Sequence, residues 1–543
     1  MRKENSEMIL RVLILICAMC TACSAALKVY VLPGSTRVCY FGKPIEIDLV
    51  IKGDVSSEFK GTLQLELVDY WGNQAKVQEQ PVELANISRT EVAMKLGVSE
   101  VGYYEINLKL IAKGVTILEQ KKLWSVAVLD YPRQFPSDSP LGTYTIGSVD
   151  LLANIVPRGF YENMAQVGAR WGTIDTWWKE LEPEKGKYNW AYYDKWFTEA
   201  LKAGITPIPH LYAIPQWASS WKPGDPGDSW TYPPIDWDQW GRFVYDFVNH
   251  YKNWLVYLRI WNEPNIEYWH GTPAEYAKLA KIAYQAARRA KPDIKVIIEA
   301  AATWEKDPID FFDAVYKADN SSYYDIIAIH NYRFNDANFP EKTQFLPTYD
   351  RFIEWRNKNK PNVEAWDTEF ACMADNWVWF IGVGEKHQAQ WLGRTHVLGF
   401  AKGLKKMFWF PGYSWGVPEK PYYNPAGLLR VDLTPRPAYV AYHTMASALS
   451  WAKYECALSL PGDRYGVVFK IPEGYVTAMW SIDANSACAV KLRFEQQQKI
   501  SVVDIMGRTS EKALGSKGEM TVDISEDIIY VYSKTVPDVN VSR

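Results

Sequence analysis

Two glutamates stand out because each follows an apolar, strand-like run of residues. Glu263 comes after the run 256–262 and is followed directly by Pro264, and Glu369 lies near the end of the run 363–370. Proline cannot continue a strand ladder, so Glu263 is expected where its strand ends. Two carboxyl groups can divide acid–base work, one as a protonated acid and the other as an anion that attacks or stabilises a cationic centre. A single glutamate is usually an ordinary loop carboxylate, but two at strand ends favour a catalytic pair.

These strand ends belong to a repeating pattern in the middle of the chain. Between residues 140 and 443, strand-like runs alternate with stretches of helical period, and the eight runs are 143–148, 169–175, 206–212, 256–263, 294–301, 324–332, 363–370 and 405–411. Eight such units predict a closed (β/α)8 TIM barrel, whose active site lies at the carboxyl ends of the strands. An open doubly wound sheet, the alternative, would bring a glycine-rich phosphate turn after its first strand, and that turn is missing.

Both flanks of the barrel show the period-2 alternation of antiparallel sheets. We predict an N-terminal, immunoglobulin-like β-sandwich over residues 27–132 and a C-terminal β-sandwich over residues 444–535. A chain of 543 residues is too long for a single core, which agrees with several domains. The expected fold class is therefore multidomain, with an α/β barrel between two all-β domains.

The first 26 residues have the layout of a secretory signal peptide. Arg2 and Lys3 precede a nearly continuous apolar run over 12–22, and small residues follow. A membrane-spanning helix needs about 20 apolar residues, so this run is too short for one. The expected location is outside the cytoplasm: secreted, periplasmic or on the cell surface. Cys23 lies in a sequence similar to a bacterial lipoprotein box, so a lipid anchor at Cys23 is the one membrane attachment to consider.

Charge and composition exclude some classes of partner. The net charge of −3 provides no basic field for a phosphate backbone, so no nucleic-acid partner is expected. Only 7 histidines occur, and they are scattered, so we predict no catalytic metal and no cofactor. The 25 tryptophans are either core residues or flat surfaces for stacking a ligand. The sequence leaves the oligomeric state open.

The motifs around the two glutamates resemble those of a known group of enzymes. Trp-Asn-Glu-Pro-Asn at 261–265 and Thr-Glu-Phe at 368–370 resemble the acid/base and nucleophile signatures of clan A glycoside hydrolases, nearest to family 39 and related cellulase-like proteins. Further likeness lies at 170–190, 204–209 and 324–332. The resemblance implies a retaining β-glycoside hydrolase that forms a covalent glycosyl-enzyme intermediate. Glu263 would be its acid/base and Glu369 its nucleophile.

The same resemblance implies roles for other polar residues at strand ends. Asn262 would hydrogen-bond the sugar 2-hydroxyl, a contact that strengthens in the transition state. Arg170 would keep the nucleophile ionised and oriented, with an interior salt bridge as the alternative. His330 and Tyr332 would line the same site. His210 either binds a sugar hydroxyl or is an ordinary buried histidine.

Aromatic residues are expected to form the sugar-binding surface. Trp409, at the end of the eighth strand, resembles the platform on which clan A enzymes stack the sugar, and Trp178 would extend that surface. The other loop tryptophans that could contribute, about half of which we expect to be core, are Trp177, Trp217, Trp221, Trp230, Trp269, Trp304, Trp377, Trp379 and Trp415. Together with an aromatic insertion over 213–234, they favour an endo-acting enzyme with several subsites.

The sequence thus predicts an endo-acting hydrolase of β-linked polysaccharides or oligosaccharides. The alternatives are an exo-acting β-glycosidase of the β-xylosidase or β-glucosidase type, and a carbohydrate-binding barrel without activity. The intact pair of glutamates favours an enzyme over a binding protein, because function is carried by the site and not by the fold.

Overall fold

The computed structural model describes residues 27–53, 59–84, 88–131, 133–146, 159–298, 302–303, 307–332, 338–376, 380–416, 423–482 and 488–539. The predicted signal peptide with Cys23 lies outside these residues, as do Trp304, Trp377 and Trp379. In the described part of the chain, no helix has the length and apolar character that crossing a membrane requires. The chain forms two compact units, one built mainly from the residues before 133 and the other holding the barrel and the C-terminal sheets.

The first unit is a β-sandwich, as its alternating sequence predicts. One sheet has the strand order β1-β3-β6 and the other β2-β8-β7-β4-β5. The strands are β1 (Leu27–Val31), β2 (Val38–Tyr40), β3 (Ile45–Gly53), β4 (Phe59–Asp69), β5 (Gln74–Leu84), β6 (Ser88–Leu96), β7 (Gly102–Ala112) and β8 (Val115–Leu129). Alternate residues such as Ile47, Leu65 and Ile106 are fully buried between the sheets. All the pairs are antiparallel except β2 with β8, which run parallel.

The second unit contains the predicted barrel, closed in the order β10-β11-β12-β13-β14-β15-β16-β9, with all neighbours parallel. Its strands are β9 (Leu141–Ile146), β10 (Trp171–Trp177), β11 (Thr206–Tyr212), β12 (Tyr257–Ile260), β13 (Lys295–Ile298), β14 (Ile326–Ile329), β15 (Glu364–Phe370) and β16 (Met407–Trp409). Each of the eight predicted runs contains one of these strands or overlaps it. Most observed strands are shorter than predicted, because polar residues at their ends leave the ladder to form the loops.

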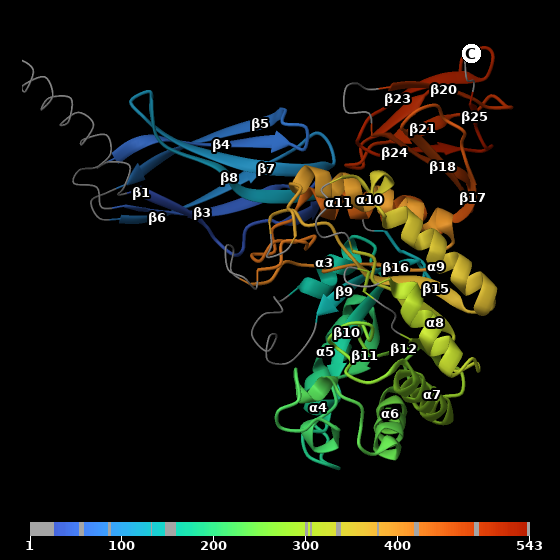
Figure 1. Cartoon of the computed structure of the whole chain (residues 1–543). Coiled ribbons are helices and arrows are strands. Elements are labelled where there is room, and N and C mark those ends of the chain that lie inside the picture. Colours follow the sequence, from blue (N-terminus) through green and yellow to red (C-terminus); the bar gives the residue numbers. More distant parts are fainter. Residues whose placement is uncertain are drawn as a thin grey trace, which may run out of the picture. The chain divides into compact units, whose positions relative to one another are not determined.

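Helices surround the barrel in the order expected of βα units (Figure 1). They are α3 (Phe160–Gln166), α4 (Trp178–Leu181), α5 (Ala191–Ala203), α6 (Trp237–Tyr251), α7 (Pro273–Ala290), α8 (Pro308–Ala318), α9 (Phe345–Asn359), α10 (Glu385–Lys402) and α11 (Pro437–Leu449). Helix α7 begins with a capping box, in which Thr272 and Glu275 each satisfy a backbone N–H of the other. Its buried face includes Leu279 and Ala283, as the helical period predicts.

Large side chains close the amino-terminal end of the barrel. Trp171, Ile208, Ile297, Trp366 and Phe408 belong to one buried cluster inside it. A barrel of eight strands is just wide enough for side chains to fill, so this end leaves no room for a ligand. A site must therefore lie at the other end, where the strands lead into their longer loops.

A second β-domain follows helix α11, as predicted. Its sheets have the orders β17-β18-β19-β24-β21-β22 and β23-β20-β25. The strands are β17 (Lys453–Ala457), β18 (Arg464–Ile471), β19 (Gly474–Ser481), β20 (Cys488–Arg493), β21 (Ile500–Val503), β22 (Thr509–Lys512), β23 (Glu519–Ile524), β24 (Ile529–Ser533) and β25 (Asp538–Val539). The boundary expected at residue 444 falls inside α11, most of whose residues are buried, including the polar His443 and Thr444. Gln390 on α10 donates to Asp527 at 2.8 Å, which ties these sheets to the barrel.

Candidate active site

Glu263 lies just beyond strand β12, on a segment with unusual backbone geometry. Trp261 and Glu263 have φ angles of 69° and 39°, in the left-handed region that non-glycine residues rarely adopt. Two hydrogen bonds hold this segment: the Trp261 amide donates to the Leu211 carbonyl at 2.9 Å, and His210 Nε2 donates to the Trp261 carbonyl at 2.6 Å. Such backbone strain persists only where the surroundings determine it, and it is concentrated at functional sites.

Glu369 reaches the same place from strand β15. Its backbone amide donates to Asp367 Oδ1 at 3.2 Å, and its Oε1 accepts a hydrogen bond of 2.7 Å from the Tyr332 hydroxyl. Tyr332 follows strand β14, so the ends of two neighbouring strands meet at this carboxylate. A neutral hydroxyl that donates to a carboxylate favours its ionised form.

His330 lies between the two glutamates and contacts both. Its Nδ1 is 2.9 Å from Glu263 Oε1 and 3.7 Å from Glu369 Oε2. One oxygen of each glutamate and a ring nitrogen of His330 all lie within 4.8 Å of one another. The two predicted catalytic residues, more than 100 positions apart in sequence, therefore share one small site.

A histidine and two carboxylates at this spacing could also bind a metal ion, but Arg259 argues against it. Arg259 Nη2 is 3.2 Å from His330 Nε2. Arginine has only donors, so Nε2 must accept, and the neutral ring then carries its proton on Nδ1. That proton points to Glu263 and occupies the position of the lone pair that a metal would need. The three groups are better explained as a hydrogen-bonded network.

Burial and like charge dominate the electrostatics of the pair. Burial, together with the negative charge of Glu263, raises the pKa of Glu369 to about 7, and the Tyr332 hydrogen bond opposes this shift. Two carboxylates this close cannot both ionise freely, so the pair retains one proton up to about neutral pH. Burial also raises the pKa of Asp367 to about 8, although the Tyr349 hydroxyl donates to it. The site can thus hold one protonated and one ionised carboxyl group side by side, as acid and nucleophile require.

A second buried network supports the Glu263 segment from below. His210 Nδ1 is 3.1 Å from Asp175 Oδ1, which also accepts from the Tyr144 hydroxyl. The Trp261 carbonyl can only accept, so Nε2 of His210 donates to it, while Nδ1 faces the Asp175 carboxyl group. Asp175 and Tyr144 were not among the predicted site residues. Asp175 is a polar residue at the end of an apolar run, and that signal was available in the sequence.

Comparisons with known proteins agree with this fold. A family 39 glycoside hydrolase from Bacteroides cellulosilyticus WH2 superposes with a TM-score of 0.72 at 19% identity, over 93% of this chain and 100% of that one. The chain has the fold of a family 39 glycoside hydrolase. A family 30 subfamily 8 xylanase from Clostridium acetobutylicum superposes with a TM-score of 0.52 at 12% identity, over 72% of this chain and 95% of that one. The likeness to clan A expected from the motifs is thus confirmed for the fold.

Sequence matches are much shorter. A β-xylosidase from Caldicellulosiruptor saccharolyticus is 28% identical over 113 residues, which are 18% of this chain and 22% of that protein's length. No protein-family model matches the chain. The match therefore covers about a fifth of each protein, and the chemistry has to be argued from the geometry of the site.

Arg170 does not contact the nucleophile, and this prediction is wrong. It precedes strand β10 at the amino-terminal end of the barrel, where its guanidinium donates to the Gly204 carbonyl. The cation near the glutamates is Arg259, fully buried within β12. A charged residue inside an otherwise apolar strand, four positions before Glu263, was the signal that could have identified it.

Trp409 is fully buried and cannot be a stacking platform, so this prediction is also wrong. Its ring packs edge-on against Trp391 of helix α10, and its Nε1 donates to the Ala426 carbonyl at 3.0 Å. Successive residues of a barrel strand point alternately to the interior and to the helices, and Trp409 points to the helices. Its neighbour Phe410 is partly exposed and has its ring centroid 6.2 Å from that of Tyr332 and 5.5 Å from that of Trp415. Phe410 and Trp415 are therefore the aromatic residues of this strand end that adjoin the site.

Trp178 and His210 are also buried, and neither can bind a sugar directly. Trp178 stacks on Phe243 of helix α6 with centroids 4.9 Å apart, and its Nε1 donates to Glu182 Oε2 at 2.8 Å. Arg242 donates to the other oxygen of Glu182 at 2.7 Å, so this cluster braces the loop after β10 against α6. For His210 the prediction of a buried histidine holds, and its hydrogen bonds position the backbone of the Glu263 segment.

Asn262 remains available for a ligand. The residue is partly exposed, while its Oδ1 is buried and has no hydrogen-bond partner in the described part of the structure. A buried acceptor without a partner costs free energy unless something donates to it. A sugar hydroxyl is one group that could do so.

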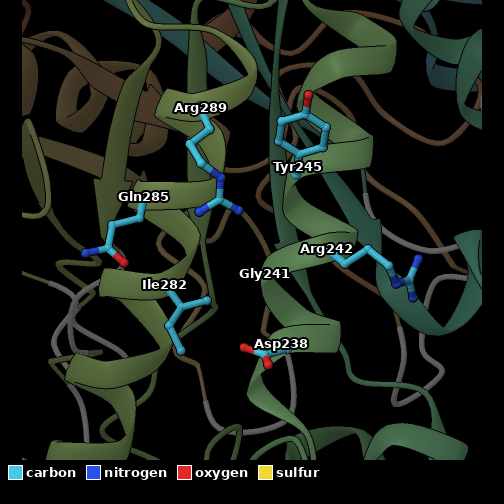
Figure 2. A pocket seen from close by; sticks show the side chains of 7 residues that line it. All are labelled: Asp238, Gly241, Arg242, Tyr245, Ile282, Gln285 and Arg289. Carbon is cyan, nitrogen blue, oxygen red and sulfur yellow. The ribbon is translucent and has the colours of Figure 1, made fainter.

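Outside the barrel, helices α6 and α7 enclose a separate groove of about 490 Å³ (Figure 2). Asp238, Arg242 and Tyr245 project from one helix, and Gln285 and Arg289 from the other (Figure 2). A Cβ on Gly241 would lie 3.1 Å from Ile282 Cγ2, so the two helices approach closely at the floor of this groove. None of the predicted site residues lines it, and we interpret it as a crease between packed helices.

Proposed function

We propose that this protein is a retaining β-glycoside hydrolase. The observation that carries the proposal is the distance of 4.8 Å or less between carboxyl oxygens of Glu263 and Glu369. Retaining enzymes have their carboxyl groups about 5–5.5 Å apart, because one of them must bond to the sugar, whereas inverting enzymes need about 6.5–9.5 Å to admit a water molecule.

In this mechanism Glu369 attacks the anomeric carbon while Glu263 protonates the departing oxygen. The hydrogen bond from the Tyr332 hydroxyl favours the Glu369 anion that attacks, and the one proton that the pair retains must be on Glu263 when the departing oxygen is protonated. The covalent intermediate is then hydrolysed by a water molecule that Glu263, now ionised, deprotonates. Asn262 would donate to or accept from the sugar 2-hydroxyl, and the His210 network would keep the Glu263 segment in place.

Azide rescue tests these roles. In Glu369→Gly, azide should occupy the vacated space and attack directly, which gives a glycosyl azide of inverted configuration. In Glu263→Ala, Glu369 should still form the intermediate from a nitrophenyl glycoside, and azide should yield the retained configuration. The exposed Glu354 on α9 provides the control, and Glu354→Ala should behave like the wild type. Azides of the same configuration from both variants would refute the assignment.

We further propose endo-acting hydrolysis of β-linked polysaccharides or oligosaccharides. The support is the insertion after β11, where Trp217, Trp221 and Trp230 are all partly exposed. Rings that remain accessible beyond the reacting pair suit a substrate with several sugar units. A time course on β-glucans, xylans and mannans tests this, since release of monosaccharide alone from the first minutes would favour an exo-acting β-glycosidase. A chain that binds these glycans without cleaving any of them would be the inactive barrel.

We also propose that residues 1–26 direct export and are removed, with a lipid anchor at Cys23 as the alternative form. Palmitate labelling of the wild type and of Cys23→Ala tests the anchor. Label in the wild type alone would establish lipidation, and an unlabelled mature protein would leave simple secretion.

A further inference from the structure

Four aromatic rings form a continuous group beside the catalytic pair. Trp177 ends strand β10 and Trp230 lies in the insertion after β11, and their rings are nearly parallel, with centroids 6.2 Å apart and planes 12° apart. The centroid of Trp230 is also 5.8 Å from that of Tyr268 and 6.1 Å from that of Tyr212, at the end of β11. Trp177, Trp230 and Tyr268 are all partly exposed.

This aromatic group adjoins the reaction centre. Trp177 lies two positions after Asp175, whose partner His210 holds the Trp261 carbonyl. Trp261 Nε1 in turn donates to the Tyr268 carbonyl at 2.9 Å, which joins Tyr268 to the Glu263 segment. Burial and then the charges of Glu263 and Glu369 raise the pKa of Tyr268, in agreement with its position next to them. A sugar unit stacked here would be near the one being cleaved.

A lysine lies over this group. Lys179 Nζ is 4.3 Å from the ring centroid of Trp177 and 5.7 Å from that of Trp230. The side chain is partly exposed, and no carboxylate of the described residues lies within ion-pair distance of it. The nearby carboxylates already have donors: Asp228 accepts from Trp230 Nε1 at 2.9 Å, and Glu180 accepts from the Tyr193 hydroxyl at 2.8 Å.

Packing alone does not explain why a charged side chain is held there. A cation–π contact at an exposed site is weaker than the rotamer entropy that a lysine loses when it is held in one position. A ligand that presents an apolar ring face and negatively charged oxygens would cover the partly exposed rings and pair with the lysine.

We propose that Trp177, Lys179 and Trp230 form a subsite for a sugar unit that carries a negative charge, either a uronic acid carboxylate or a sulfate ester. The rings stack on the apolar face of the sugar, and the lysine ammonium pairs with its anionic group. Lysine acts as a point charge and suits either anion. This inference rests on the proposed function and specifies its substrate class.

Lys179→Met tests the subsite, because methionine keeps much of the apolar stem and removes the charge. The substrates are an oligosaccharide with a uronic acid, its carboxyl-reduced neutral counterpart and a sulfated counterpart. The variant should lose about tenfold or more in kcat/KM on the charged substrate and remain unchanged on the neutral one. Whichever charged substrate shows the loss identifies the source of the anion. Equal effects on charged and neutral substrates, or none on either, would overturn the proposal.

A matched control and a binding measurement complete the experiment. Lys195 Nζ lies 4.7 Å from the ring of Trp196 on helix α5, and neither residue belongs to the subsite, so Lys195→Met removes a similar cation–π contact and should change neither rate. Calorimetry with the Glu369→Gln variant, with and without Lys179→Met, measures binding of the acidic oligosaccharide without catalysis. If the wild type hydrolysed no glycan while Lys179→Met still weakened this binding, the proposed function would fail and the subsite would stand.

Discussion

The barrel buries charged side chains at both ends of its strands, but it compensates the charges differently. At the amino-terminal end, Lys406 donates to the carbonyls of Asp138 and Ser139 at 3.1 and 3.0 Å, and its Nζ lies 4.6 Å from the ring centroid of Trp171. One cation is satisfied there by neutral groups. At the carboxyl end, two glutamates share His330, and the Tyr332 hydroxyl donates to Glu369.

The difference separates a structural charge from a functional one. Carbonyls and rings around Lys406 leave nothing for a ligand to neutralise. Two like charges held together are costly for the fold, and they are retained where a reaction needs one acid and one anion. A strained backbone at Trp261 and Glu263 adds a second cost at the same end. The following predictions test this contrast, beginning with the largest expected effect.

Removing the nucleophile should abolish activity, whereas removing the charge at the other end should not. In Glu369→Gln no covalent intermediate can form, so kcat/KM should fall by a factor on the order of 10⁴–10⁶. Lys406→Met should keep a rate close to that of the wild type. Kinetics on an aryl β-glycoside measure both, and similar losses in the two variants would remove the distinction between the ends.

Stability should depend on pH in opposite directions at the two ends. Burial and the neighbouring Glu263 charge raise the pKa of Glu369 to about 7, so the folded pair retains a proton that the unfolded chain loses near the ordinary pKa of 4.5, and stability falls as pH rises between these values. Glu369→Gln should therefore be more stable than the wild type at pH 7, by an amount on the order of 3 kcal/mol, and should lose this advantage near pH 4.

At the other end, burial lowers the pKa of Lys406 from 10.5 to about 8, so the unfolded chain binds more protons between these values. The stability of the wild type relative to Lys406→Met should then rise as pH increases from 8 to 10.5. Denaturant unfolding measures the two slopes: the wild type is compared with Glu369→Gln between about pH 4 and 7, and with Lys406→Met between about pH 8 and 10.5. Slopes of the same sign at the two ends would contradict the assignment of the two buried charges.

Tyr332→Phe should produce an intermediate loss. It removes the 2.7 Å hydrogen bond to Glu369 and leaves the ring in place. A hydrogen bond to a charged group contributes about 1.5–3 kcal/mol, so kcat/KM should fall roughly 10- to 100-fold. Without this donor the pKa of Glu369 should rise further, so the pH profile should also shift to higher pH. An unshifted profile with a reduced rate would indicate a packing role for Tyr332.

A chelator should have the smallest effect. If His330 carries its proton on Nδ1, the cluster with Glu263 and Glu369 offers no imidazole lone pair to a metal, and dialysis against EDTA should leave kcat unchanged. Loss of activity that returns on addition of zinc would show that the cluster binds metal, and the hydrogen-bonded network would have to be reassigned.

Local pattern in the sequence was enough to predict the order of the elements and the two glutamates. Strands and helices differ in hydrophobic period, so eight βα units could be counted, and β11 matches its predicted range of 206–212. Glu263 could be identified because Pro264 follows it directly and ends the strand-like run. These signals depend only on a few neighbouring residues, so they can be recognised without any knowledge of the tertiary structure.

Which side chains face the site was decided only by the tertiary structure. Parallel barrel strands are buried on both faces, so alternation does not show in their hydropathy, and nothing local distinguishes Trp409 from Phe410. Arg170 and Arg259 differ in which end of a strand they occupy and in which face they point to, and closure of the barrel sets both. His210 likewise became a support of the Glu263 segment only because Asp175 and the Trp261 carbonyl, 35 and 51 positions away, fold against its two nitrogens.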